Sequence, residues 1–150
     1  MKFKTESEKE TKIIAEKLAK KIKKNKSGAT IITLSGDLGS GKTAFTKGFA
    51  QFFDVLDISS PTFVLMKKYS LKKKKFKNLY HIDCYRLENK SDLKELNFNK
   101  ISKDKENIIL IEWPERMKNI PVERIEIKFK AIGRRERVIT ILGDGIEKKV

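Results

Sequence analysis

The sequence predicts an α/β fold with a mainly parallel central sheet and antiparallel hairpin additions. Segments with helical periodicity alternate along the chain with strand-like segments, which is the order that parallel sheets require. Two of the strand-like segments, residues 29–34 and 107–111, are mostly apolar and β-branched, as strands buried on both faces are. The chain has 150 residues, of which 39% are hydrophobic, which is enough for one core. We therefore predict a single domain over residues 1–150.

Two helices are predicted in the first third of the chain. Over residues 7–24, apolar side chains recur at a spacing of four, with lysine and glutamate on the other face. The apolar positions are Ile14, Leu18 and Ile22, with Ala15 and Ala19 beside them. Residues 26–28 end this helix and lead into the first buried strand. A second helix should begin near Lys42 and bury Phe45, Phe49 and either Phe52 or Phe53.

Two hairpins and a short helix are predicted in the rest of the chain. Residues 59–62 should form a loop, because Pro61 lacks a backbone donor and disfavours helical geometry at Ser60. The strand-like residues 63–71 and 76–85 are separated by four lysines, which suit the solvated tip of a hairpin. Residues 91–96 resemble a short helix. Near the end, Ile125, Ile127 and Phe129 alternate with charged residues, and residues 138–142 should pair with them across a turn at 133–135.

The chain is strongly basic, with a formal net charge of +15 and a sequence pI of about 9.8. Such a balance fits an acidic partner such as RNA, DNA or an acidic protein surface. It equally fits biased codon usage, because most of the excess is scattered lysine. Cys84 is the single cysteine, which excludes an intrachain disulfide. No apolar leader or membrane-spanning run is present, so a cytoplasmic location is predicted.

Between the first buried strand and the second helix lies the sequence GDLGSGKT. Its Gly36-x-x-x-x-Gly41-Lys42-Thr43 spacing is the P-loop, or Walker A, pattern, and a strand before it and a helix after it are the context that this pattern requires. Backbone N–H groups of such a loop and the helix N-terminus bind phosphates, the lysine reaches the outer phosphates, and the threonine hydroxyl can bind magnesium. The pattern predicts a P-loop NTPase-like three-layer domain that binds a nucleoside triphosphate.

A P-loop enzyme also needs a carboxylate at the end of a neighbouring strand to hold magnesium. Glu112 closes the second buried strand, and we interpret it as this ligand, with a surface carboxylate as the alternative. Asp83 ends a less apolar strand and could help to bind the metal, orient water or pair with Arg86. His81, the single histidine, is expected to make a structural hydrogen bond beside the site. Trp113 fits either core packing or an exposed stacking platform.

Residues 89–92, NKSD, match the NKxD pattern that reads guanine in GTPases. No DxxG sequence lies between them and the P-loop, and Ser91 suits the N-cap of the short helix instead. We therefore predict that the bound base is adenine.

Five segments occur in a fixed order: GDLGSGKTAFTKGFA, SSPTFVLMKKY, YHIDCYRL, LIEWPERM and GRRERV. Together they resemble the TsaE family, also called YjeE, whose members are small bacterial P-loop ATPases needed to make threonylcarbamoyladenosine in tRNA. The resemblance covers nearly the whole chain and includes the opening helix, SEKETKIIAEKLA.

The resemblance implies a function and a set of site residues. In the family, ATP binding and hydrolysis support a separate pair, TsaB and TsaD, and TsaD transfers the threonylcarbamoyl group to adenosine. Lys42, Asp83 and Glu112 would be catalytic, and Thr43 and Glu112 would bind Mg2+. ATP would contact Thr11, Gly39, Ser40, Gly41, Lys42, Thr43, Ala44, Thr62, Gly133 and Arg134. Thr62 would sense the outer phosphate, whereas Thr11 and the Gly133-Arg134 turn would lie near the nucleoside.

Two positions depart from the family pattern. Ala44 stands where a second threonine is usual, so one hydroxyl contact to phosphate is lost, worth about 1 kcal/mol. Asn97 stands where a glycine commonly ends the short helix, and asparagine is the next best residue for a left-handed helix end.

Two other functions remain open from the sequence. A small-molecule kinase would also need a P-loop, but no long arginine-rich lid segment follows the P-loop helix. An RNA- or protein-binding module with ATP as a structural ligand would draw on the net charge and the lysine-rich hairpin. Contact with tRNA could be indirect, through TsaB and TsaD, or direct.

Overall fold

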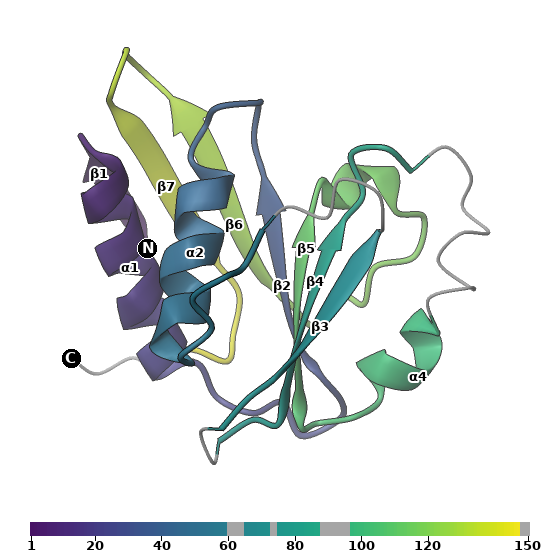
Figure 1. The fold of residues 1–150 in the computed structure, drawn as a ribbon. Helices are drawn as coiled ribbons and strands as arrows, with labels where there is room; N and C mark the ends of the chain where they lie inside the picture. The colour runs from purple at the N-terminus through teal and green to yellow at the C-terminus, as the bar shows by residue number, and fades with distance from the viewer. Residues whose placement is uncertain (60–64, 73–74, 88–96, 148–150) are drawn as a thin grey trace.

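The computed structural model describes residues 1–59, 65–72, 75–87 and 97–147. Within these ranges, seven strands form one sheet in the order β1-β7-β6-β2-β5-β4-β3 (Figure 1). The strands are β1 (Lys2–Thr5), β2 (Thr30–Ser35), β3 (Met66–Ser70), β4 (Asn78–Asp83), β5 (Asn107–Glu112), β6 (Ile125–Ala131) and β7 (Arg137–Leu142). The helices are α1 (Glu8–Lys21), α2 (Lys42–Phe52), α4 (Phe98–Ser102) and the 3-10 helix η1 (Pro114–Arg116).

The centre of the sheet is parallel and both of its edges are antiparallel. Strand β2 pairs in parallel with β5 and β6, and β5 pairs in parallel with β4. At one edge of the sheet, β7 pairs antiparallel with β6, and β1 pairs antiparallel with β7. At the other edge, β3 pairs antiparallel with β4. The α/β fold, the mainly parallel central sheet and the antiparallel hairpin additions predicted from the sequence are therefore confirmed.

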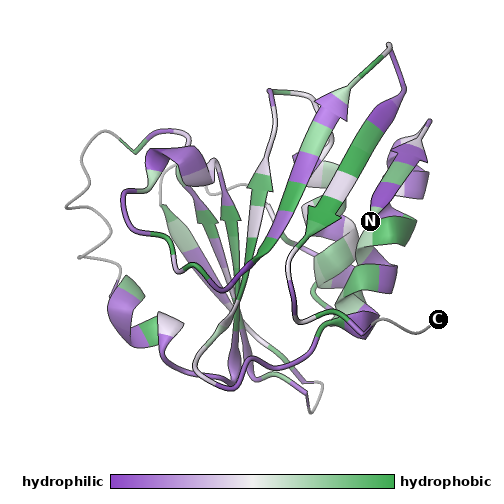
Figure 2. Cartoon of the chain, turned by 180° about the vertical axis from the view of Figure 1, so that it is seen from behind, coloured by the Kyte–Doolittle hydropathy of each residue, from purple (hydrophilic) through white to green (hydrophobic). Residues whose placement is uncertain are grey.

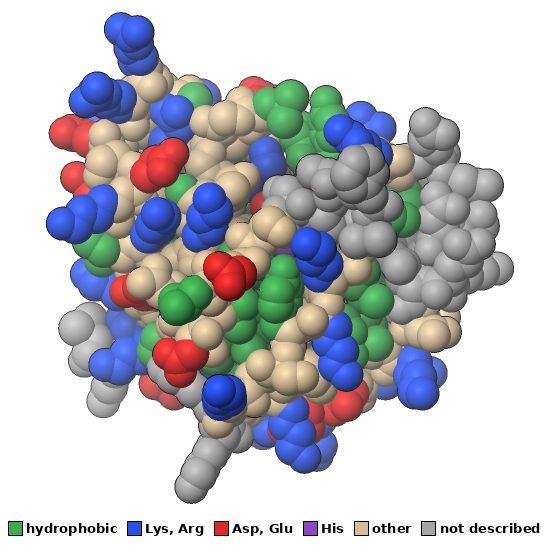
Figure 3. All heavy atoms as spheres, in the orientation of Figure 1, with side chains coloured by type: hydrophobic (Ala, Val, Ile, Leu, Met, Phe, Trp, Pro, Cys, Tyr) green, Lys and Arg blue, Asp and Glu red, His purple; other side chains and the backbone are tan. Residues whose placement is uncertain are grey.

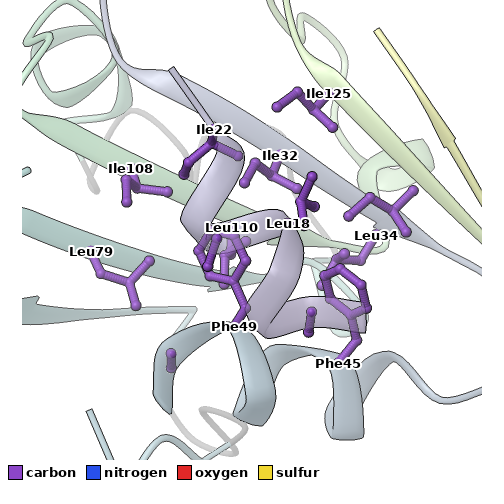
Figure 4. Close-up of a cluster of buried hydrophobic side chains, with 14 of the residues drawn as sticks. Leu18, Ile22, Ile32, Leu34, Phe45, Phe49, Leu79, Ile108, Leu110 and Ile125 are labelled. Carbon is purple, nitrogen blue, oxygen red and sulfur yellow. The ribbon is translucent and has the colours of Figure 1, made fainter. Parts of the chain in front are cut away.

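Side chains of the two central strands alternate between two cores, one on each face of the sheet. Ile32 and Leu34 of β2 join Leu110 of β5 under α1 and α2, where Figure 4 shows Phe45 and Phe49 pointing from α2 toward the strands. On the other face, the odd-numbered side chains of β2 and β5 pack against α4 and the end of η1. Because both faces are covered, every residue of β5 is buried, which explains the apolar run at residues 108–111 between Asn107 and Glu112.

The antiparallel edge formed by β6 and β7 is covered on one face only. Ile125, Ile127 and Phe129 point into the core under α1 and α2, whereas Lys128 and Lys130 between or beside them are exposed. Figure 2, the view from behind, shows hydrophilic and hydrophobic residues alternating along these strands. A period of two is the pattern expected of a strand with one solvated face.

Both predicted helices of the first third are present, with one corrected boundary. Ser7 caps α1 by accepting a hydrogen bond from the Glu10 N–H. The helix ends at Lys21 rather than residue 24, because the next backbone groups pair with the C-terminal segment instead: Lys23 N donates to Gly145 O. Of the two alternatives at the end of α2, Phe53, which follows the helix as its C-cap, is the buried one at 2% exposure, and Phe52 is half-buried.

The hairpin predictions are also confirmed, with strands shorter than expected. Strands β3 and β4 pair antiparallel, and Leu71 N donates to Lys77 O across the lysine-rich connection. The predicted loop residues 60–62 and the predicted helix 91–96 lie outside the described residues. Asn97 adopts the expected left-handed conformation, with φ of 53°. Strand β1 and helix α4, each of five residues or fewer, were not predicted from the sequence.

Gly48→Ala is expected to destabilise the fold, although alanine is the better helix former by about 1 kcal/mol. Helices α1 and α2 approach so closely that a Cβ at Gly48 would lie 2.5 Å from the backbone oxygen of Lys12. The helices must move apart, so we expect a loss of about 1–3 kcal/mol in the free energy of unfolding, measured with urea. Gln51→Ala, at an exposed position of the same helix, is the control and should change stability by less than about 0.5 kcal/mol. Equal or greater stability of the Gly48 variant would contradict this prediction.

Candidate nucleotide-binding site

The candidate site lies at the edge of the sheet where the parallel strands end. Asp83 and Glu112 are the last residues of β4 and β5 and are directly paired in the register of the two strands. Leu34, near the end of β2, pairs with Glu112 on the other side, and the P-loop begins two residues later, at Gly36. Both carboxylates and the loop therefore meet at the carboxyl ends of adjacent parallel strands, which is where ligands bind in open α/β sheets.

The P-loop is shaped by glycines at two positions that other residues would disturb. A Cβ on Gly36 would lie 2.7 Å from both the backbone oxygen of Phe129 and the hydroxyl of Ser40. Gly41, immediately before α2, has φ of 110°, in the left-handed region that favours glycine. The backbone then enters α2 at Lys42, so the N-terminus of this helix faces the pocket, as in phosphate sites.

Lys42 is buried at the base of the loop, with 6% of its surface exposed. Its ammonium group donates to the backbone oxygens of Gly36 and Asp37, the latter at 2.9 Å, and lies 4.3 Å from the centre of the Trp113 ring. Burial lowers the pKa of Lys42, and the nearby carboxylates, Glu112 first among them, oppose that shift. A cation that is partly desolvated and held by neutral partners can exchange them for phosphate oxygens.

Trp113 is half-buried and has φ of 57°, so the chain turns sharply after β5. Its ring also packs against Tyr85, with the ring centres 4.9 Å apart. The sequence left two alternatives open for Trp113, a core position and an exposed stacking platform. The half-buried ring fits neither description fully. Trp113 instead forms one wall of the pocket, beside the P-loop lysine.

The two carboxylates have different surroundings. Glu112 is 4% exposed, and its Oε1 accepts a hydrogen bond from the Thr46 hydroxyl at 3.2 Å. Asp83 is half-buried, and its Oδ1 accepts from the Tyr85 N–H at 3.0 Å. Burial raises the pKa of Asp83 and the carboxylate of Glu112 adds to the rise, whereas the Tyr85 N–H opposes it. Two carboxylates placed side by side at the ends of adjacent strands favour a cation between or beside them.

These groups line a pocket of about 560 Å³, within the size range of small-ligand sites. Its walls come from the start of α1, the P-loop, the ends of β4 and β5, and the turn between β6 and β7. That turn supplies Arg134 and Arg135, and Arg137 at the start of β7 donates to the Gly39 backbone oxygen at 3.1 Å. The pocket therefore combines a P-loop with several cations, which suits a polyphosphate ligand.

Magnesium would find oxygen donors in this pocket. Within the described ranges, no cluster of three or more His, Cys, Asp or Glu side chains could hold a metal ion unaided. Magnesium commonly needs only one or two carboxylates, because substrate phosphates and water complete its shell. Thr43, Asp83 and Glu112 all line the pocket, so the donor set fits a magnesium ion bound together with a nucleotide.

Comparison with known proteins identifies the chain's relatives. The family model described as "Threonylcarbamoyl adenosine biosynthesis protein TsaE" matches residues 5–139. The chain belongs to the TsaE family. A relative, "tRNA threonylcarbamoyladenosine biosynthesis protein TsaE" of Bacillus subtilis, is 37% identical over 147 residues, which are 97% of this chain and 87% of that protein. The protein of the same name from Rickettsia prowazekii is 38% identical over 138 residues, 90% of each chain.

A solved structure supports the same assignment. The crystal structure of Bacillus subtilis YdiB matches with a TM-score of 0.63 and 33% identity, covering 94% of this chain and 83% of that one. The resemblance to the TsaE family that the sequence motifs suggested is therefore confirmed, as is the family's role in threonylcarbamoyladenosine biosynthesis. None of the helices in the described ranges combines the length and apolarity that crossing a bilayer requires.

The structure brings together most of the residues that the TsaE resemblance assigned to nucleotide and metal. The assigned residues that line the pocket are Thr11, Gly39, Gly41, Lys42, Thr43, Ala44, Asp83, Glu112 and Arg134. Ser40 is a buried residue of the P-loop itself, and Gly133 is at the exposed turn, where its backbone oxygen accepts from Arg137. Thr62 lies outside the described residues.

Two parts of the sequence interpretation need correction. Arg135, Arg137 and Tyr85 line the pocket but were not singled out, although all three belong to the quoted motifs GRRERV and YHIDCYRL. His81 lies beside the site as expected, yet neither ring nitrogen has a hydrogen-bond partner within the described structure. The neighbouring Cys84 is buried, which raises the pKa of its thiol to about 12 and makes it a poor nucleophile.

Asp83→Asn is expected to stabilise the fold at neutral pH. The gain in the free energy of unfolding should be smaller than the loss expected from Gly48→Ala. The folded state binds the Asp83 proton more tightly than the unfolded state does, so ionisation costs stability as the pH rises through the folded-state pKa. Asparagine removes that cost and keeps an oxygen that can accept from the Tyr85 N–H. Urea unfolding should show the gain at pH 7 and its disappearance at acidic pH, where aspartate is protonated in both states. Lower stability of the variant at pH 7 would contradict this prediction and would indicate that nearby cations stabilise the charged carboxylate of Asp83.

Proposed function

We propose that residues 1–150 act as one ATPase domain that supports threonylcarbamoyl transfer by the TsaB–TsaD pair in the cytoplasm. The observation that carries the proposal is the meeting of Lys42, Thr43, Asp83 and Glu112 in one pocket at the ends of parallel strands. In P-loop enzymes these residue types bind phosphate, hold magnesium and orient water. The transfer itself belongs to TsaD, and contact with tRNA would occur through that complex.

Each residue has a role that its position supports. The P-loop backbone and Lys42 bind the phosphates, and Thr43 and Glu112 would hold Mg2+, which neutralises charge on the outer phosphates. Asp83 would orient the water near the metal, and its raised pKa suits a group that holds or accepts a proton. Thr11 and Arg134 line the side of the pocket away from the strand ends, where the nucleoside would lie.

The rim of the pocket suits a protein partner. Leu38 of the P-loop lines the pocket and is 71% exposed, and Ile132, next to the Gly133 turn, is 47% exposed. Exposed apolar side chains beside a functional site often mark an interface. By contrast, lysine, arginine and acidic side chains are interspersed over the face shown in Figure 3, rather than gathered into one basic patch. We therefore place TsaB–TsaD at the mouth of the nucleotide pocket.

Steady-state ATP hydrolysis by the purified protein, alone and with cognate TsaB and TsaD, tests this proposal. We expect slow turnover alone and stimulation by the pair, with Lys42→Ala as the blank. A rate above the blank that the pair leaves unchanged would argue against partner control and favour a kinase, which would then phosphorylate a small molecule. Tight ATP binding without turnover in any mixture would instead favour a binding module.

A further inference from the structure

A second polar cluster lies behind the nucleotide pocket, between α2 and the sheet. Alternation along β4 and β5 turns His81 and Glu112 to the face that α2 covers, and the helical spacing of three brings Thr43 and Thr46 to the same place. A small cavity of about 10 Å³ is lined by Thr43, Thr46, Lys47, Ile58, Ser59, His81 and Glu112. Glu112 lines both this cavity and the nucleotide pocket, so it connects the two.

The contacts inside the cluster converge on one oxygen of Glu112. The Thr46 hydroxyl donates to Oε1 at 3.2 Å, and His81 Nε2 lies 3.7 Å from the same oxygen, just beyond hydrogen-bond distance. His81 is 1% exposed, and both of its ring nitrogens lack partners in the described part of the chain. A buried polar group without a partner costs free energy, so a fully enclosed imidazole beside a carboxylate requires an explanation.

We propose that Thr46 and His81 are positioning residues that hold Glu112 for magnesium. This inference rests on the proposed function, in which Glu112 binds the ion. Thr46 holds Oε1 of the carboxylate, and the imidazole with its proton on Nε2 needs only a small side-chain rotation to donate to the same oxygen. The carboxylate is then restrained from behind while it faces the nucleotide pocket. Groups that orient a metal ligand in this way set its affinity for the metal.

Magnesium titrations of nucleotide binding test the inference. Calorimetry with a non-hydrolysable ATP analogue gives the affinity at a series of magnesium concentrations and in excess EDTA. For Thr46→Val, which keeps the shape and removes the hydroxyl, the magnesium concentration at half-effect should rise about 10- to 100-fold. The affinity in EDTA should be unchanged, since the phosphate-binding residues are intact. Thr46→Ser should restore the magnesium response, and His81→Phe, which keeps a ring without nitrogens, should shift it in the same direction as Thr46→Val.

Thr33→Val is the matched control, because Thr33 is a buried threonine of β2 that lines a different groove, near η1. It should leave the magnesium response unchanged. The inference is overturned if Thr46→Val and His81→Phe both keep the wild-type response, or if Thr46→Val weakens binding equally with and without magnesium. A wild-type protein whose nucleotide affinity is independent of magnesium would overturn the proposed metal role of Glu112 as well, so the two failures are distinguishable.

Discussion

Lys42→Ala should lower ATP hydrolysis by about 100- to 1,000-fold, the usual cost of removing one charge-stabilising donor from a transition state. The ammonium group already lies among the P-loop carbonyls and Lys42 is 6% exposed, so the substitution removes a cation that the loop holds in place. Nucleotide affinity should also fall, both with and without magnesium, because the proposed function gives the lysine a direct contact with phosphate. Support of tRNA threonylcarbamoylation by TsaB and TsaD should be abolished.

The fold should survive this substitution. Removing the ammonium group leaves the backbone oxygens of Gly36 and Asp37 without one donor, but Asp37 O still accepts from Ser40 N, and Asp37 is exposed. Circular dichroism and urea unfolding would check this point. Lys17→Ala, at an exposed position of α1, is the matched control and should retain wild-type turnover. Normal tRNA modification supported by Lys42→Ala would contradict the proposed function.

The sequence predicted the central strands of the fold because their signals are local. Strands β2 and β5 are short apolar runs next to a P-loop and a terminal glutamate, and no distant contact is needed to recognise them. Strand β1 was missed because its four residues gain their order from β7, at the other end of the chain. A second contact with the C-terminal segment explains the early end of α1, since the Lys23 N–H donates to Gly145 O instead of continuing the helix. Pairing over such separations leaves little trace in a local pattern.

The residues of the candidate site likewise divide into those that a local pattern predicts and those that only the fold brings together. Motif spacing pointed to Lys42, Thr43 and Glu112, because each role depends on a neighbouring helix or strand end. Arg137 was not predicted as a pocket residue, because its contact with Gly39 joins residues 98 positions apart that only the fold brings together. Thr46 escaped notice too, because it resembles an ordinary helical threonine until the sheet places Glu112 opposite it. In this protein, local sequence patterns pointed to residues that line the pocket more readily than to the residues packed behind them.

Glu112→Gln should have the opposite effect on binding from Lys42→Ala when magnesium is absent. The carboxylate repels phosphate without a metal, so its neutral isostere should bind ATP in EDTA as tightly as the wild type or more tightly. Magnesium should then strengthen binding far less, because a carboxylate is a better ligand for this ion than an amide. Hydrolysis in saturating magnesium and ATP should fall about 100-fold or more, since charge on the outer phosphates is no longer neutralised in place.

Comparing the two variants in the same titration separates a metal ligand from a phosphate ligand. Lys42→Ala should weaken binding under both conditions, whereas Glu112→Gln should weaken it only with magnesium present. Glu126→Gln, which removes a half-buried carboxylate of β6 that pairs with Arg124, is the matched control and should follow the wild type. If Asp83→Asn, and not Glu112→Gln, removes the magnesium response, then Asp83 is the direct ligand and Glu112 has the supporting role. Because the two carboxylates are direct neighbours on adjacent strands, only their response to the ion can distinguish these assignments.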